Sequence, residues 1–130
     1  MPRLTTLLFS LTLIPALSVN AIAAEPPTLA GIYSDLALNQ ESGDLGGLEL
    51  LLIPTAKADH YQVVVQMSEG ETPTVAVTTI QVSNGLFSLA FKPEGADKSI
   101  NMSCKVAVKE ISCSSAGITE KLRRGKSYWQ

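Results

Sequence analysis

The chain has 130 residues and a formal net charge of −2, from ten Lys or Arg and twelve Asp or Glu. This slightly acidic balance argues against non-specific binding to nucleic acid, which requires a basic surface. Hydrophobic residues make up 45% of the chain and charged residues 17%, so the composition predicts a folded domain and excludes a low-complexity, disordered chain.

The N-terminal segment is typical of an export signal. Arg3 supplies a positive charge, residues 4–19 form an apolar stretch interrupted by Pro15, and Ala21-Ile22-Ala23 matches the small-x-small pattern read by signal peptidase. We therefore expect residues 1–24 to be a cleaved signal peptide and residues 25–130 to form a single domain. The predicted location is periplasmic or secreted.

After this segment, apolar residues occupy alternate positions. The runs Tyr61–Met67, Phe87–Phe91 and Ile100–Val108 all have this period of two, which is typical of strands with one face on a core. Turn residues separate the runs, and Asn84-Gly85 is the strongest hairpin signal. The runs predict eight strands, at roughly 30–38, 46–53, 60–68, 74–82, 86–92, 99–107, 110–114 and 118–124. Because every connection is short, sequential neighbours should pair antiparallel, and we expect an all-β up-and-down meander forming a closed or nearly closed barrel.

The strand predicted at 46–53 departs from this alternation. Leu51 and Ile53 lie on the face that should contact water, and Val64, Ile80 and Val82 add further apolar residues on faces that should be wet. An outward apolar surface of this kind can be a contact for a partner or a second copy. Alternatively, the segment 26–29 or a crossing loop covers it. The sequence leaves both interpretations open.

The two cysteines have the same inward parity. If Val106 opposes Ile111 on neighbouring strands, Cys104 opposes Cys113 on the same face, which is a suitable geometry for a cross-strand disulfide. Exported proteins are oxidised, so we expect this bridge to form and to be structural. The implied two-residue turn Val108-Lys109 has poor hairpin chemistry, and a wider loop is expected there.

Few catalytic arrangements are available. His60 is the single histidine, so a multi-histidine zinc site is impossible, and bridged cysteines leave no soft metal ligands. The sequence contains no Gly-x-Ser-x-Gly nucleophile elbow and no glycine loop that precedes a helix. Paired carboxylates of the glycosidase type stay open; the candidates are Glu49, Asp59, Glu69 and Glu71. We expect a non-enzymatic protein without a metal or cofactor.

An outer-membrane barrel is a further possibility for eight strands. The outward positions carry polar residues such as Gln62, Gln66 and Lys105, and the chain has only three Phe, three Tyr and one Trp, too few for two aromatic girdles. We therefore expect no stable membrane insertion.

Two short motifs resemble the lipocalin, or calycin, pattern. Gly31-Ile32-Tyr33 opens the first strand as a Gly-x-aromatic, and Arg123 or Arg124 lies at the end of the last. The resemblance implies a structural pair of Tyr33 with Arg123, in which the arginine stacks on the aromatic ring. The tail 122–129 is similar to that of small uncharacterised secreted bacterial proteins. The lipocalin-like family implies binding of small apolar ligands in the barrel mouth.

Two functions from different classes follow. The first is a binding protein for a small apolar ligand, held by inward side chains of the central strands: Tyr61, Val63, Phe87, Phe91 and Met102. The alternative is a protein-interaction module, either an inhibitor or an envelope accessory protein. It would use the outer apolar residues or the C-terminal aromatics Tyr128 and Trp129.

Overall fold

The computed structural model describes residues 28–70 and 72–130, so the predicted signal peptide lies outside the described residues. The described chain contains strands and turns but no helix. Its strands are β1 (Gly31–Ser34), β2 (Ala37–Leu38), β3 (Leu45–Pro54), β4 (His60–Glu69), β5 (Thr74–Gln81), β6 (Leu86–Phe91), β7 (Ile100–Ala107), β8 (Glu110–Ser115) and β9 (Ile118–Gly125). Within these residues no helix long and apolar enough to cross a bilayer is found.

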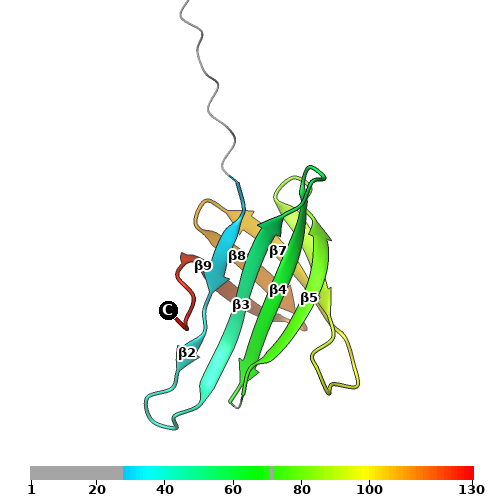
Figure 1. Cartoon of the computed structure of the whole chain (residues 1–130). Coiled ribbons are helices and arrows are strands. Elements are labelled where there is room, and N and C mark those ends of the chain that lie inside the picture. The colour runs from blue at the N-terminus through cyan, green and yellow to red at the C-terminus, as the bar shows by residue number, and fades with distance from the viewer. Residues whose placement is uncertain (1–27, 71) are drawn as a thin grey trace, which may run out of the picture.

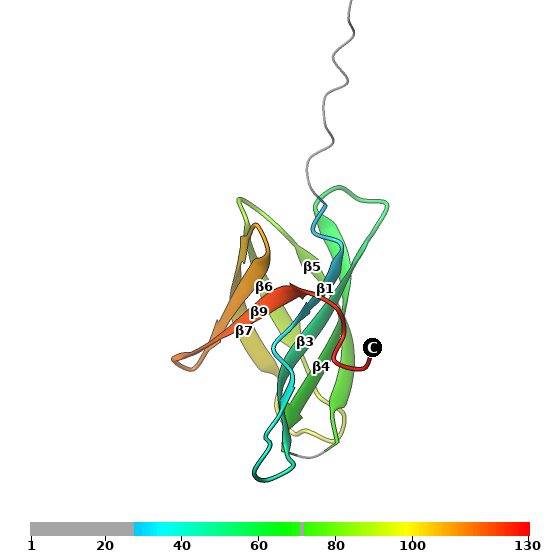
Figure 2. The same ribbon diagram turned by 90° about the vertical axis from the view of Figure 1, so that its left-hand side faces the viewer.

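The strands form one antiparallel sheet that curls into a nearly closed barrel (Figures 1 and 2). The order around the sheet is β5-β4-β3-β1-β9-β8-β7-β6, with β2 paired to β3 at the side. The first and last long strands are therefore neighbours, and Tyr33 of β1 lies opposite Arg124 of β9. The all-β, nearly closed barrel predicted from the alternation is confirmed.

The first predicted strand, 30–38, is in fact two strands, because the chain bends at Asp35. The carboxylate oxygen Oδ1 of Asp35 accepts the backbone N–H of Leu48 at 2.6 Å, a bond that a backbone carbonyl would accept in a regular ladder. Gly47 makes this possible, since a Cβ built there would lie 2.7 Å from Asp35 Oδ1 and 2.8 Å from its carbonyl oxygen. The structure thus has nine strands where the sequence predicted eight.

The core fills the inside of the barrel with inward side chains, and Ile80, which the sequence placed on a face in contact with water, is one of them because its register opposite Tyr61 turns it inward. Successive core residues on one strand are two apart, as Phe87, Leu89 and Phe91 are on β6, which a strand with a single inner face requires. The cluster comprises Tyr33, Leu48, Leu50, Leu52, Val63, Val65, Ile80, Phe87, Leu89, Phe91, Cys104, Ile111, Cys113 and Leu122. Because it draws on every strand except the short β2, the core holds the two halves of the curled sheet together.

The barrel has one open seam, between β5 and β6. Asn84 and Gly85 both have positive φ, at 51° and 72°, and form the tight turn predicted for this pair. The isolated bridge of Ser83 with Leu86 closes this turn, but within the described residues no ladder joins β5 to β6 beyond it. The expectation that all sequential neighbours pair is therefore wrong here, because β5 follows β4 along its whole length while β6 follows β7 into the opposite half of the sheet.

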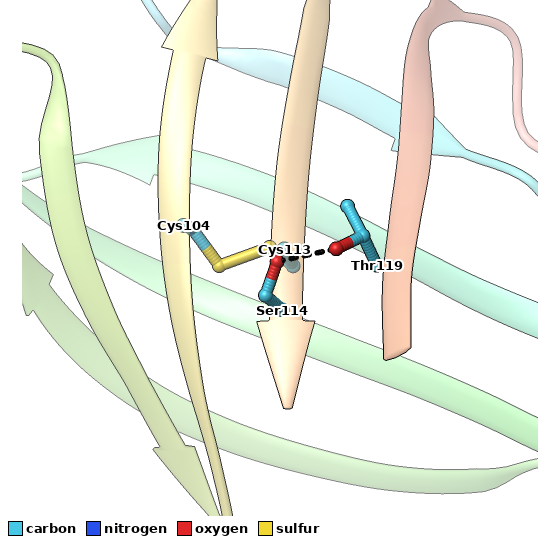
Figure 3. The surroundings of a disulfide bond; sticks show 4 residues. All are labelled: Cys104, Cys113, Ser114 and Thr119. Carbon is cyan, nitrogen blue, oxygen red and sulfur yellow. Dashed lines mark hydrogen bonds between the residues drawn. A yellow bond between two sulfur atoms is a disulfide. The ribbon is translucent and has the colours of Figure 1, made fainter. Parts of the chain in front are cut away.

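The cysteines form the predicted cross-strand disulfide. Val106 opposes Ile111, Cys104 opposes Cys113, and the Cα atoms of the two cysteines are 4.1 Å apart. Figure 3 shows the bridge between β7 and β8, beside the hydrogen bond of 2.7 Å between the Ser114 and Thr119 hydroxyls that links β8 to β9. The disulfide is consistent with an oxidising extracellular or periplasmic location.

The hairpin that carries the disulfide turns more tightly than expected. Ala107 pairs with Glu110, so Val108 and Lys109 alone make the turn. Neither residue has a positive φ, so this turn does not require the Gly or Asn on which the expectation of a wider loop rested. Val108 is 90% exposed at the tip.

Candidate functional site

The five residues proposed to hold an apolar ligand are brought together inside the barrel. Val63, Phe87 and Phe91 belong to the buried core cluster, while Tyr61 and Met102 are partly buried and pack against it. Their side chains contact the rest of the core. Their position agrees with the predicted inward parity.

Two open hollows flank the seam. The lower one, of about 720 Å³, lies between the end of β4, the start of β5 and the loop before β7. Its lining residues are Met67, Glu69, Thr72, Thr74, Ile100 and the segment 93–98. The upper one, of about 550 Å³, lies beside the Asn84-Gly85 turn and includes Gln81, Leu86, Phe87 and Cys104. Of the five predicted ligand residues, Phe87 alone lines one of these two hollows.

Acidic side chains gather near the lower end of the barrel. Burial raises the pKa of Glu120 above its usual range, and the negative charges of Asp35 and Glu69 raise it further. Burial also raises the pKa of Asp35, against the effect of the hydrogen bond from the Leu48 N–H. The interior at this end therefore disfavours further negative charge. Among the described residues, no group of three or more His, Cys, Asp or Glu is arranged to hold a metal ion.

The opposite end is closed by an arginine. The guanidinium carbon of Arg124 lies 5.8 Å from the centre of the Tyr33 ring, and its Nη2 donates to the Ala30 carbonyl at 2.6 Å. The Tyr33 hydroxyl donates to the Leu29 carbonyl at 3.2 Å. Burial raises the pKa of Tyr33, while the positive charge of Arg124 acts in the opposite direction.

This contact corrects the structural pair proposed from the sequence. The pair is Tyr33 with Arg124, whereas Arg123 lies opposite Ser34, with the opposite side-chain parity. Gly31 is required beside it, since a Cβ at that position would lie 3.3 Å from Arg124 Nε and the backbone φ is +141°. The Gly-x-Tyr motif is thus explained by the space that Arg124 occupies.

An apolar row crosses the outer face of the sheet. Ile32 pairs with Leu51, Leu51 with Val64, and Val64 with Val77, so four strands contribute one apolar residue each. Val77 is 59% exposed. Ile53 and Val75 extend the row to either side on the same face, and both are exposed. We call the set Ile32, Leu51, Ile53, Val64, Val75 and Val77 the outer patch.

The C-terminal tail, residues 126–130, folds back beside this patch. Ser127 Oγ donates to Glu49 Oε1 at 2.6 Å, and the Tyr128 N–H donates to Glu49 Oε2 at 3.0 Å. Trp129 Nε1 donates to Gln66 Oε1 at 2.7 Å, and its ring meets that of Tyr128 edge to face. Glu49 is only 6% exposed as a result. The tail therefore covers Glu49 at the edge of the outer patch, and segment 26–29, which the sequence offered as a cover, lies in part outside the described residues.

Two other candidates have ordinary surroundings. His60 begins β4, and its Nδ1 lies 2.8 Å from the Ala58 carbonyl oxygen, within its own turn. Glu49, one of the acids considered for glycosidase chemistry, is engaged by the tail.

The chain was compared with protein-family models, with curated proteins and with solved structures, and none of the three comparisons gave a match.

Proposed function

We propose that this chain is a periplasmic or secreted, non-enzymatic interaction module whose partner is another protein, docked on the outer patch beside the tail aromatics. The observation that carries the proposal is the continuous row Ile32–Leu51–Val64–Val77 on a face that is otherwise in contact with water. Scattered exposed apolar residues need no explanation, but contiguous ones on four neighbouring strands do.

The tail supports this proposal in two ways. It places Tyr128 and Trp129, which are 38% and 55% exposed, next to an aliphatic surface. Aromatic residues of this kind carry a large share of the free energy in protein–protein interfaces. The tail is also fixed by three hydrogen bonds to β3 and β4, so binding would require little further ordering of these side chains.

The test is site-specific photocrosslinking in cells that naturally make the protein. A photoreactive phenylalanine at Gln62, which is exposed between Ile53 and the upper end of β5, should give one discrete adduct with another protein. The double variant Ile53→Lys, Val64→Lys should abolish that adduct. Leu86→Lys is the matched control, because Leu86 is 54% exposed on β6, away from the patch. An adduct that survives the double variant, or that Leu86→Lys removes equally, would refute the proposal.

A second candidate is a small-molecule binding protein, favoured by the lower hollow. Its volume of about 720 Å³ is within the range of ligand sites, and Met67 and Ile100 give it apolar walls. Three acidic residues, Glu69, Glu94 and Asp97, line the same hollow. Lys98 is the one basic residue in its described lining, so the balance favours an amphipathic ligand with a positive end over a wholly apolar one. Native mass spectrometry of protein purified from its own cells should detect the retained ligand. Ile100→Trp, which would fill the hollow, should release it, and an identical spectrum for this variant would exclude the site.

A further inference from the structure

The outer edge of β5 has unpaired backbone groups. The N–H of Val82 donates to the Asp59 carbonyl, and in an antiparallel ladder such hydrogen-bonded pairs recur at every second residue. On β5, the backbone N–H and C=O groups that point toward β4 therefore belong to every second residue. These residues are Ala76, Thr78 and Ile80, which pair with Val65, Val63 and Tyr61. The N–H and C=O groups of Val75, Val77 and Thr79 point the other way, into the seam. Within the described chain, the ladders of β5 are with β4 alone.

This edge also lacks the charges that usually protect an edge strand. No charged residue occurs from Thr72 to Phe91, although charged residues make up 17% of the chain. Natural edge strands are commonly protected by lysines, prolines or bulges that prevent pairing with another chain. β5 has eight residues and a regular register with none of these features. Such an edge is suited to a further strand.

The residues of β5 are also complementary to themselves. In an antiparallel pair of two β5 strands centred on Val77, Val77 would face Val77 of the second copy and Val75 would face Thr79, which is nearly isosteric with valine. On the inner face, Ala76 would meet Thr78, and both are small. The two central outer pairs, Val77 with Val77 and Val75 with Thr79, would then be β-branched, which is favourable across strands.

Charge favours a second copy as the occupant. Each chain carries a formal net charge of −2, so two copies repel weakly wherever their acidic residues meet. Along β5 no such repulsion arises, because no ionisable side chain lies on the strand. At a two-fold axis each residue near the axis lies close to its own copy. A charged residue there would meet the same charge, so uncharged residues at the axis favour a symmetric contact.

We propose that two copies of this chain associate through β5, as antiparallel strands related by a two-fold axis at Val77. The sheet then continues from one copy to the other, and the apolar row of the outer patch continues with it. This proposal goes beyond the interaction module proposed above and does not depend on it, because it rests on the unpaired backbone groups of β5, although the side chains of Val75 and Val77 belong to both surfaces.

The primary test uses the unmodified, oxidised protein at increasing concentration. Sedimentation equilibrium should give a mass rising from one chain to two. In parallel, hydrogen exchange should slow at the amides of Val75, Val77 and Thr79, by about tenfold where nine-tenths of the chains are paired. The amides of Ala76 and Thr78 already bond to β4 and should change little. A protein that stays monomeric, or a dimer in which the three seam-facing amides stay unprotected, overturns the proposal.

Variants provide the matched control. Val77→Lys places two like charges at the axis and should give a monomer, whereas Leu86→Lys, an equally exposed residue on β6, should leave the dimer intact. Val77→Cys should form an intermolecular disulfide under mild oxidation, with peptide mapping to verify that the Cys104–Cys113 bridge is retained. A dimer that Leu86→Lys dissociates and Val77→Lys does not would contradict the β5 contact. A seam occupied by a different protein strand would likewise contradict it.

Discussion

The two sides of the barrel differ in a way that chain proximity does not explain. β1 and β9, which lie at opposite ends of the described chain, are paired and are joined by the Arg124 contacts to Tyr33 and Ala30. β5 and β6, which are joined by a tight turn, share one bridge and then separate. We call these regions the closed side and the seam (Figures 1 and 2).

The difference shows what closes a sheet of this size. On the closed side, the guanidinium of Arg124 lies over the Tyr33 ring, in space that is left free because Gly31 has no Cβ. β1 and β9 are therefore held together by side-chain contacts as well as by the hydrogen bonds of their ladder. At the seam, the side chains facing the core belong to two separate ladders and nothing comparable bridges the strands. A favourable turn fixes the first rung of a hairpin, whereas pairing along its length depends on the neighbours of each strand.

The largest effect is expected from removing the closed side's aromatic ring. Tyr33 is 1% exposed, so Tyr33→Ala should lower the free energy of unfolding by about 4 kcal/mol, through lost burial and the cavity left behind. The seam counterpart, Leu86→Ala, removes an exposed side chain and should change it by less than about 0.5 kcal/mol. Urea denaturation measures both. If Tyr33→Ala fails to fold, Tyr33→Phe should still show a loss of about 1 kcal/mol from the hydrogen bond to Leu29. Equal decreases in the free energy of unfolding for Tyr33→Ala and Leu86→Ala would contradict the difference between the closed side and the seam.

The disulfide should come next, because it fastens β7 to β8 in the half of the sheet that ends with β6 at the seam. Replacing Cys104 and Cys113 together by Ala should lower stability by about 2.5 kcal/mol, since the two cysteines are only nine positions apart and close a short loop. Urea denaturation with and without reductant measures this loss. Reductant should destabilise the natural protein by a similar amount and leave the double variant unchanged. A bridge whose reduction has no effect would mean that β7 and β8 are held by their ladder alone.

A smaller effect is expected where the tail meets β3. Ser127→Ala leaves Glu49 covered by the tail but removes the donor to its Oε1, which should lower stability by about 1 kcal/mol. Trp129→Phe removes a more exposed hydrogen bond to Gln66 and should cost less than about 0.5 kcal/mol. Trp129 is the single tryptophan, so its fluorescence in the Ser127→Ala variant reports tail release directly. Unchanged stability and fluorescence would show that the tail does not stabilise the fold.

The smallest effect concerns the acidic lower end. The pKa of Glu120 is raised in the folded state, so ionisation opposes folding, and its contribution is most favourable below the unfolded value of 4.5 and lost as pH rises through the folded pKa. Glu120→Gln should therefore raise the melting temperature at pH 7 and have a much smaller effect at pH 4. Thermal melts at both pH values measure this difference. Glu110→Gln, on the outer face of β8, is the control, and a destabilising Glu120→Gln at pH 7 would contradict the sign.

Much of this architecture was predictable, and the failures have identifiable causes. Period-two runs such as 60–68 located β4 and its neighbours to within a residue or two, and inward parity alone paired Cys104 with Cys113. The bend at Asp35 was missed because it depends on a side chain replacing a backbone acceptor for a residue thirteen positions away. The seam was missed because the Asn84-Gly85 signal describes a turn and carries no information on the ladder beyond it.

The surroundings of the candidate site were harder to predict. The outer apolar residues were visible as exceptions to alternation in β3 and β4. That they continue into β5 as a single row depends on the register of three ladders, which follows only from the fold. The tail contact joins Ser127 to a carboxylate 78 positions earlier, and no local pattern predicts such a pairing.

The position of β9 constrains when the barrel can close during synthesis, because β1 pairs with β9. The ring of Tyr33 lies against the guanidinium of Arg124, which a ribosome adds 91 positions later. A nascent chain that has emerged only as far as β8 has no partner strand on this side of β1 and cannot yet seal the barrel. Termination before β9 would therefore leave β1 and β8 each with one unpaired edge in addition to the two edges at the seam, and such fragments should be removed quickly by proteolysis.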